Sequence, residues 1–137
     1  MSDDEWRAPN GFTYGSLVAI LRHTMQAERG WSMSLRGEPP LPRPPGPRVE
    51  PSMAELLGDW QAEEAKMRPW LLSLKDADLV ERRLPPRAGG PSLVYWQAMS
   101  HVTFHSMQHR SEAAEALTMA GRSPGELDFF FFLRPRE

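Results

Sequence analysis

The residues most able to do chemistry in this sequence are its histidines, and they are unevenly placed. Three of the four, His101, His105 and His109, lie at intervals of four, and His23 lies far upstream. In an α-helix, residues four apart diverge by only about 40°, so these three would share one flank. Measured from the centre of the apolar stripe of that helix, His109 falls about 40° away, His105 about 80° and His101 about 120°. We therefore expect His105 and His109 to face the interior or its edge, and His101 to be the most exposed to water.

This spacing suits a metal ion. Two imidazoles at i and i+4 can both reach one ion about 2.0–2.1 Å from each nitrogen, and His23 from another helix would complete a set of three. Three protein ligands leave positions open for water or substrate, which is typical of catalytic rather than structural sites. Zinc, nickel, iron and copper all suit imidazole. The alternative is a coincidence of spacing, in which each histidine is a hydrogen-bonded residue at a helix interface.

The composition limits the class of protein. The chain has 137 residues, a length that predicts a single domain over residues 1–137 with one sizeable core. A formal net charge of −2 offers no basic surface for nucleic acid or for a membrane. No apolar run could span a bilayer, and the acidic amino end is unlike a signal or transit peptide. Because the chain has no cysteine, thiolate sites and disulfides are excluded, and we expect a cytoplasmic protein.

Helical periodicity predicts the elements that must position the histidines, and the fold class is all-α. Three long helices are expected: one over residues 13–35, one that begins at Ser52, and one over residues 92–121. Ser52 and Glu55 form a capping box for the second helix, and Pro69 should kink or split it. The apolar side of that helix is expected to consist of Leu56, Leu57, Trp60, Met67, Leu71 and Leu74. The stripe of the third helix consists of Tyr95, Met99, Val102, Ser106, Ala113 and Leu117.

Two proline-rich connectors join these helices. Seven of the 14 prolines fall within residues 38–51, which predicts an extended, polyproline-II-like crossover. The alternative is a ligand for a proline-recognising domain. Residues 84–91 have the same character. Residues 122–137 form a C-terminal tail, whose apolar stretch 129–133 we expect either to lie over the bundle or to contribute to a dimer contact.

Four stretches of the chain resemble the DinB/YfiT-like family. Residues 12–31, FTYGSLVAILRHTMQAERGW, look like its first metal-ligand helix, and Arg36-Gly-Glu-Pro fits the segment after that helix in the family. Residues 96–110, WQAMSHVTFHSMQHR, resemble its second signature, and residues 117–128, LTMAGRSPGELD, its continuation. The resemblance covers most of the chain in the right order.

The resemblance implies a four-helix bundle, often dimeric, that carries one divalent ion on three histidines. By residue matching the ligands are His23, His105 and His109, with zinc or nickel favoured and iron a further option. Some family members are transferases that use a low-molecular-weight thiol such as mycothiol, bacillithiol or glutathione. The resemblance implies no DNA binding.

The chain departs from the family pattern at two places. Met1–Trp6 resembles the loop after the family's first helix, so we expect that helix to be missing. Either the true start lies upstream or a second subunit covers the exposed face, and a two-fold homodimer is expected. Ser111 and Glu112 also stand where the family often has Gly-Gln.

Further residues carry charge near the expected core or its surface. Glu28 falls within the apolar stripe of the first helix and should be paired, with Arg110 a candidate, or else accept a hydrogen bond from a ligand imidazole. Arg110 and His101 are further candidates for contact with a substrate. Glu63 and Glu64 are expected on a solvated face.

These observations lead to three hypotheses about function. The first is a metal-dependent enzyme that transfers a low-molecular-weight thiol to an electrophilic small-molecule substrate. The second is a non-catalytic metal-binding or stress-response module. The third is a plain dimeric helical protein without metal.

Overall fold

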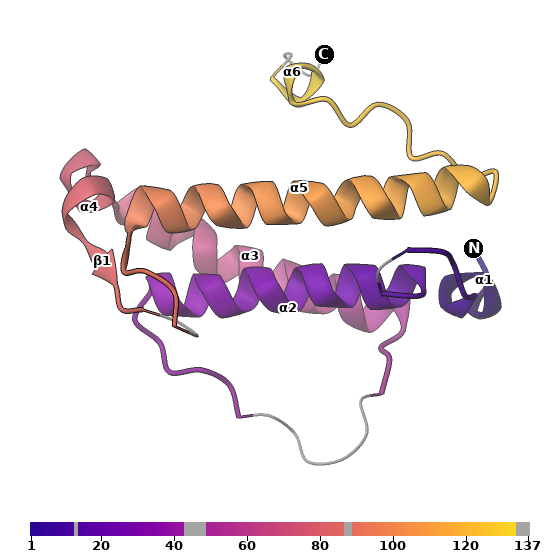
Figure 1. Ribbon diagram of the computed structural model, residues 1–137, viewed down its shortest axis with the longest axis horizontal. Coiled ribbons are helices and arrows are strands. Elements are labelled where there is room, and N and C mark those ends of the chain that lie inside the picture. The colour runs from indigo at the N-terminus through magenta and orange to yellow at the C-terminus, as the bar shows by residue number, and fades with distance from the viewer. Residues whose placement is uncertain (13, 43–48, 87–88, 134–137) are drawn as a thin grey trace.

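The computed structural model of this chain describes residues 1–12, 14–42, 49–86 and 89–133. Within these ranges the fold is all-α, as predicted, with three long helices and a sheet that consists of a pair of two-residue strands (Figure 1). The elements in chain order are α1 (Asp3–Arg7), α2 (Leu17–Leu35), α3 (Met53–Ser73), α4 (Asp76–Glu81), β1 (Arg83–Leu84), β2 (Leu93–Val94), α5 (Tyr95–Met119) and α6 (Phe129–Phe132). None of the helices in the described ranges is long and apolar enough to cross a membrane.

The helix α2 is central, because it packs against both α5 and α3 (Figure 1). The Tyr95 hydroxyl at the start of α5 donates a hydrogen bond of 2.9 Å to the Leu35 carbonyl at the end of α2. The two helices are therefore antiparallel, and their register is fixed at this end.

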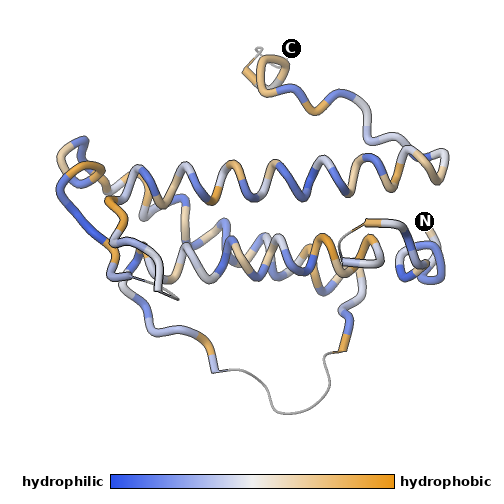
Figure 2. Tube along the Cα trace, in the orientation of Figure 1, coloured by the Kyte–Doolittle hydropathy of each residue, from blue (hydrophilic) through white to orange (hydrophobic). Residues whose placement is uncertain are grey.

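Two apolar clusters hold the helices together, one toward each end of α2. One contains Trp6, Leu17, Val18, Ile20, Met25, Leu56 and Ala113. The other contains Leu35, Leu84, Tyr95 and Ala98. Figure 2 shows the apolar positions recurring along the long helices between polar ones, as expected of amphipathic helices.

The helix starts follow local capping signals. The side chain of Ser16 accepts a hydrogen bond from the Ala19 amide and caps α2, so this helix begins four residues later than predicted. Thr13, where we expected it to begin, lies outside the described residues. The Ser52–Glu55 capping box of α3 is confirmed. A capping box between Ser2 and Glu5 likewise starts α1, a short helix where we expected only a loop.

The interior of α3 differs from the prediction in two respects. Of the two effects predicted for Pro69, a kink or a split, the split does not occur: the helix runs through Pro69 to Ser73, because proline removes only one backbone donor and a single turn remains beyond it. The predicted apolar side is also only partly covered. Leu56 is buried, whereas Leu57 and Leu71 are 57% and 42% exposed. Part of the apolar side of this helix therefore faces solvent.

A small hairpin precedes α5. The strands β1 and β2 pair antiparallel, with Arg83 opposite Val94 and Leu84 opposite Leu93. The side chains of Leu84 and Val94 are buried, so the hairpin closes one end of the bundle. This pairing displaces the start of α5 from the predicted Ser92 to Tyr95. Of the two proline-rich connectors, residues 43–48 and 87–88 lie outside the described part of the chain.

The C-terminal tail does not lie over the bundle as expected. The helix α6 stands apart from the long helices at the end of an extended segment (Figure 1). The side chains of Phe129 and Phe130 are 68% and 62% exposed. Asp128 caps this helix by accepting a hydrogen bond from the Phe130 amide. The tail is therefore not an intramolecular cover.

A buried ion pair links α3 to the end of α2. Glu63, predicted to be solvated, is only 6% exposed, and its carboxylate accepts a hydrogen bond of 2.7 Å from Arg36. Arg29 approaches the other Glu63 oxygen at 3.8 Å. The neighbouring Glu64 is exposed and pairs with Arg68 on the surface, as predicted for a solvated face. The prediction for Glu63 was wrong because two arginines of the preceding segment offset the cost of its burial.

We expect Glu63→Ala to destabilise the protein by about 3 kcal/mol, because it leaves the buried Arg36 without its partner on α3. The matched control Glu64→Ala removes the adjacent exposed carboxylate and should change the unfolding free energy by less than about 0.5 kcal/mol. Urea unfolding of both variants measures the difference. Equal unfolding free energies for Glu63→Ala and Glu64→Ala would show that the ion pair between Glu63 and Arg36 does not stabilise the fold.

Candidate metal centre

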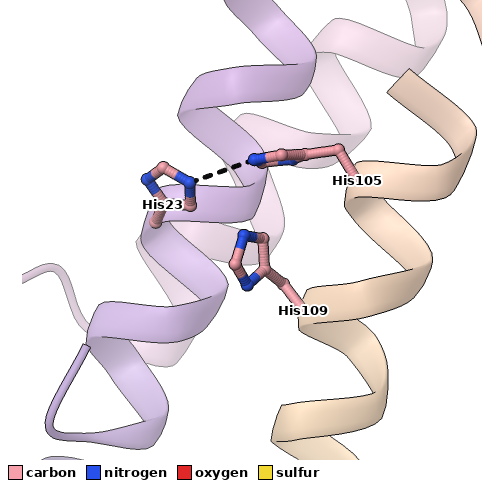
Figure 3. Close-up of side chains that lie close together, drawn as sticks. All are labelled: His23, His105 and His109. Carbon is pink, nitrogen blue, oxygen red and sulfur yellow. Dashed lines mark hydrogen bonds between the residues drawn. The ribbon is translucent and has the colours of Figure 1, made fainter. Parts of the chain in front are cut away.

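Three histidines meet at the interface between the two antiparallel helices. His23 extends from α2, and His105 and His109 extend from α5 on consecutive turns (Figure 3). His109 is buried, His105 is half-buried and His101 is exposed. The order of exposure that the helical wheel predicted is therefore confirmed.

The ring nitrogens of the three side chains converge. One nitrogen from each lies within 4.8 Å of the other two, and the Nε2 atoms of His23 and His105 are 3.3 Å apart (Figure 3). Two nitrogens bound tetrahedrally at zinc distances would be about 3.3 Å apart, so this spacing fits one shared ion. Two imidazole lone pairs at this distance repel unless a proton or a cation lies between them.

The electrostatics of the cluster favour neutral imidazoles. Burial lowers the pKa of His23, and the neighbouring His109 and His105 lower it further. Burial also lowers the pKa of His105, followed by the effects of His109 and His101, while the carboxylates of Glu28 and Glu112 oppose the shift. Both rings are therefore neutral at pH 7, which is the form that binds a metal.

A comparison with known families agrees with this geometry. The family model described as the DinB superfamily matches residues 1–113. The chain belongs to the DinB superfamily. No curated protein matches the chain significantly. Superfamily membership and the three converging histidines together fit a metal-binding protein of the DinB type.

Glu112 is a functional candidate that the sequence reasoning did not assign. Its Oε2 lies 2.9 Å from Nδ1 of His109, one turn along α5. A carboxylate at this position accepts a hydrogen bond from the Nδ1–H group of His109, which leaves the Nε2 lone pair of that ring free for an ion. The signal available in the sequence was the spacing of three residues between His109 and Glu112, which makes them neighbours on one face of a helix.

Tyr14 is a second residue that the sequence reasoning did not assign. Its ring stacks on that of His23 with centroids 4.2 Å apart and planes at 21°. It also meets the His109 ring edge-on at a centroid distance of 5.3 Å. Tyr14 comes from the segment between α1 and α2, which therefore helps to hold two of the three imidazoles in place.

Glu28 and Arg110 form the pair that the sequence suggested. Arg110 Nη2 lies 3.2 Å from one Glu28 oxygen, and the Trp60 indole donates a hydrogen bond of 2.6 Å to the other. The Glu28 carboxylate therefore links α2 to both α5 and α3. Its charge also acts on His105, where it opposes the lowering of the imidazole pKa.

We expect His105→Ala to lower the bound divalent metal sharply, because it removes one of the converging nitrogens. His101→Ala removes an exposed imidazole one turn away on the same helix and should leave the metal content nearly unchanged. Metal analysis of both purified variants after loading with zinc and desalting decides the assignment. Equal loss in both would contradict the set of His23, His105 and His109.

Proposed function

We propose that this DinB superfamily protein is a metal-dependent transferase that joins a low-molecular-weight thiol to an electrophilic small molecule. The observation that supports the proposal most is the convergence of His23, His105 and His109. Three imidazole ligands suit zinc or nickel first, with iron a further option, and leave coordination positions for a thiol. A bound divalent ion lowers the pKa of a thiol and supplies a thiolate at neutral pH.

The chain's own residues serve to place and hold these imidazoles. Glu112 accepts a hydrogen bond from the Nδ1–H group of His109 and so fixes which nitrogen faces the site. Tyr14 stacks on His23 and limits rotation of its ring. A low-molecular-weight thiol is the main reductant of the cytoplasm, which is where this proposal places the protein.

A thiol-transfer assay tests the activity. The zinc-loaded protein is mixed with glutathione, mycothiol or bacillithiol and with 1-chloro-2,4-dinitrobenzene, in which the thiolate forms a carbon–sulfur bond and chloride leaves. We expect a rate well above the uncatalysed reaction with at least one thiol, and only the background rate for His23→Ala. Background rates with all three thiols, in protein that retains its zinc, would favour a non-catalytic metal-binding module instead.

We also propose that the protein forms a homodimer through α5. Trp96, Phe104 and Met107 on α5 lie within about 80° of one another around the helix. They are 50%, 74% and 42% exposed. A second copy related by a two-fold axis would cover this apolar surface with the same surface of its own.

We expect the protein to sediment as a dimer at micromolar concentration and Phe104→Glu to shift it toward monomer, because a charge would enter the apolar interface. The control Leu72→Glu alters an exposed apolar residue of α3 and should leave the dimer intact. A soluble wild-type protein that sediments as a monomer would refute the dimer.

A further inference from the structure

A cavity lies at the end of the bundle that the hairpin closes, and His101 is part of its lining. Its volume is about 430 Å³, which is within the range of small-molecule sites. It is bounded by the second half of α2, the β1–β2 hairpin and the first part of α5. Its lining residues are Gln26, Ala27, Gly30, Trp31, Leu84, Pro85, Gly90, Pro91, Leu93 and His101.

The described lining is apolar apart from the polar side chains of Gln26 and His101. None of the described lining residues carries a carboxylate, an ammonium or a guanidinium group. Gln26 and His101 can hydrogen-bond, and Trp31 offers a broad aromatic surface. Among these described residues a charged group of a ligand would find no charged partner. The lining suits an uncharged organic molecule with an apolar or aromatic body.

A row of rings connects the cavity to the candidate metal centre. The Trp31 and His101 ring centroids are 5.0 Å apart, and those of His101 and His105 are 5.7 Å apart. A molecule in the cavity beside Trp31 therefore lies about one helical turn from a proposed metal ligand. His101 stands between the two sites.

We propose that this cavity binds the apolar body of an uncharged organic substrate, and that His101 holds a polar group of that substrate by a hydrogen bond. The inference rests on the proposed function for its chemistry, since the cavity would hold the electrophile whose reactive atom faces the thiol at the histidines. His101 is then a substrate-binding residue rather than a metal ligand.

Gly30 offers a way to fill the cavity without disturbing the helix. A Cβ added there meets no atom within 4 Å, and its backbone angle is that of an ordinary helical residue. Leucine also has a higher helix propensity than glycine, so Gly30→Leu should fold. Gly58→Leu is the matched control, because Gly58 is also a helical glycine with open space, on α3 and outside this cavity.

The probe is 1,3-dinitrobenzene, an uncharged arene that quenches tryptophan fluorescence and has no leaving group. We expect saturable quenching in the wild type and in Gly58→Leu, and a loss of affinity of at least about tenfold in Gly30→Leu. His101→Phe keeps the ring but removes the hydrogen-bond donor, so it should weaken binding severalfold. Unaltered binding in Gly30→Leu would overturn the cavity assignment, and unaltered binding in His101→Phe would overturn the role of His101.

Zinc content measured on the same samples separates this inference from the proposed function. Retained zinc with unaltered probe affinity in Gly30→Leu refutes the cavity and leaves the metal centre in place. If the samples contain no zinc and only Gly30→Leu loses affinity for 1,3-dinitrobenzene, the metal centre is refuted and the cavity is supported.

Discussion

The close antiparallel packing of α2 against α5 is the constraint on which the rest of the molecule depends. The residues that α5 buries at this interface include Ala98, Ser106 and Ala113, which are small and allow the two helices to approach closely. The Tyr95 hydroxyl on the Leu35 carbonyl fixes their register at one end. The apolar cluster around Trp6 and Leu17 fixes it at the other. Between these two points, a histidine from α2 meets two histidines from consecutive turns of α5.

The same register places the other polar contacts of the interface. Glu28 on α2 meets Arg110 on α5 and Trp60 on α3, so one carboxylate ties three helices together. Next to the histidines, Trp31 of α2 meets His101 of α5 at the edge of the cavity. A shift of either helix by one turn would separate the histidine nitrogens and also break the Glu28 contacts. Stability and site geometry therefore rest on the same packing.

Much of this arrangement could be predicted from the sequence because helical periodicity is a local property. The spacing of the histidines indicated their common flank and the order of their exposure, and the capping box at Ser52 indicated a helix start. The features that could not be predicted depend on contacts distant in the chain. From the sequence Glu63 resembles a surface residue, and only its contacts with Arg29 and Arg36 of the preceding segment explain its burial. The hairpin could not be predicted because each of its strands has only two residues. The tail was misplaced because its apolar residues do not specify a surface to pack on.

X-ray absorption spectroscopy of the zinc-loaded protein counts the ligand atoms around the ion and so tests whether the three histidines bind it. We expect three imidazole nitrogens at about 2.0–2.1 Å, together with one or more oxygen ligands from solvent. Addition of a low-molecular-weight thiol should then introduce a sulfur at about 2.3 Å. A zinc ion surrounded by oxygen alone, or by fewer than three imidazoles, would contradict the claim that the packing of α2 against α5 builds a metal centre.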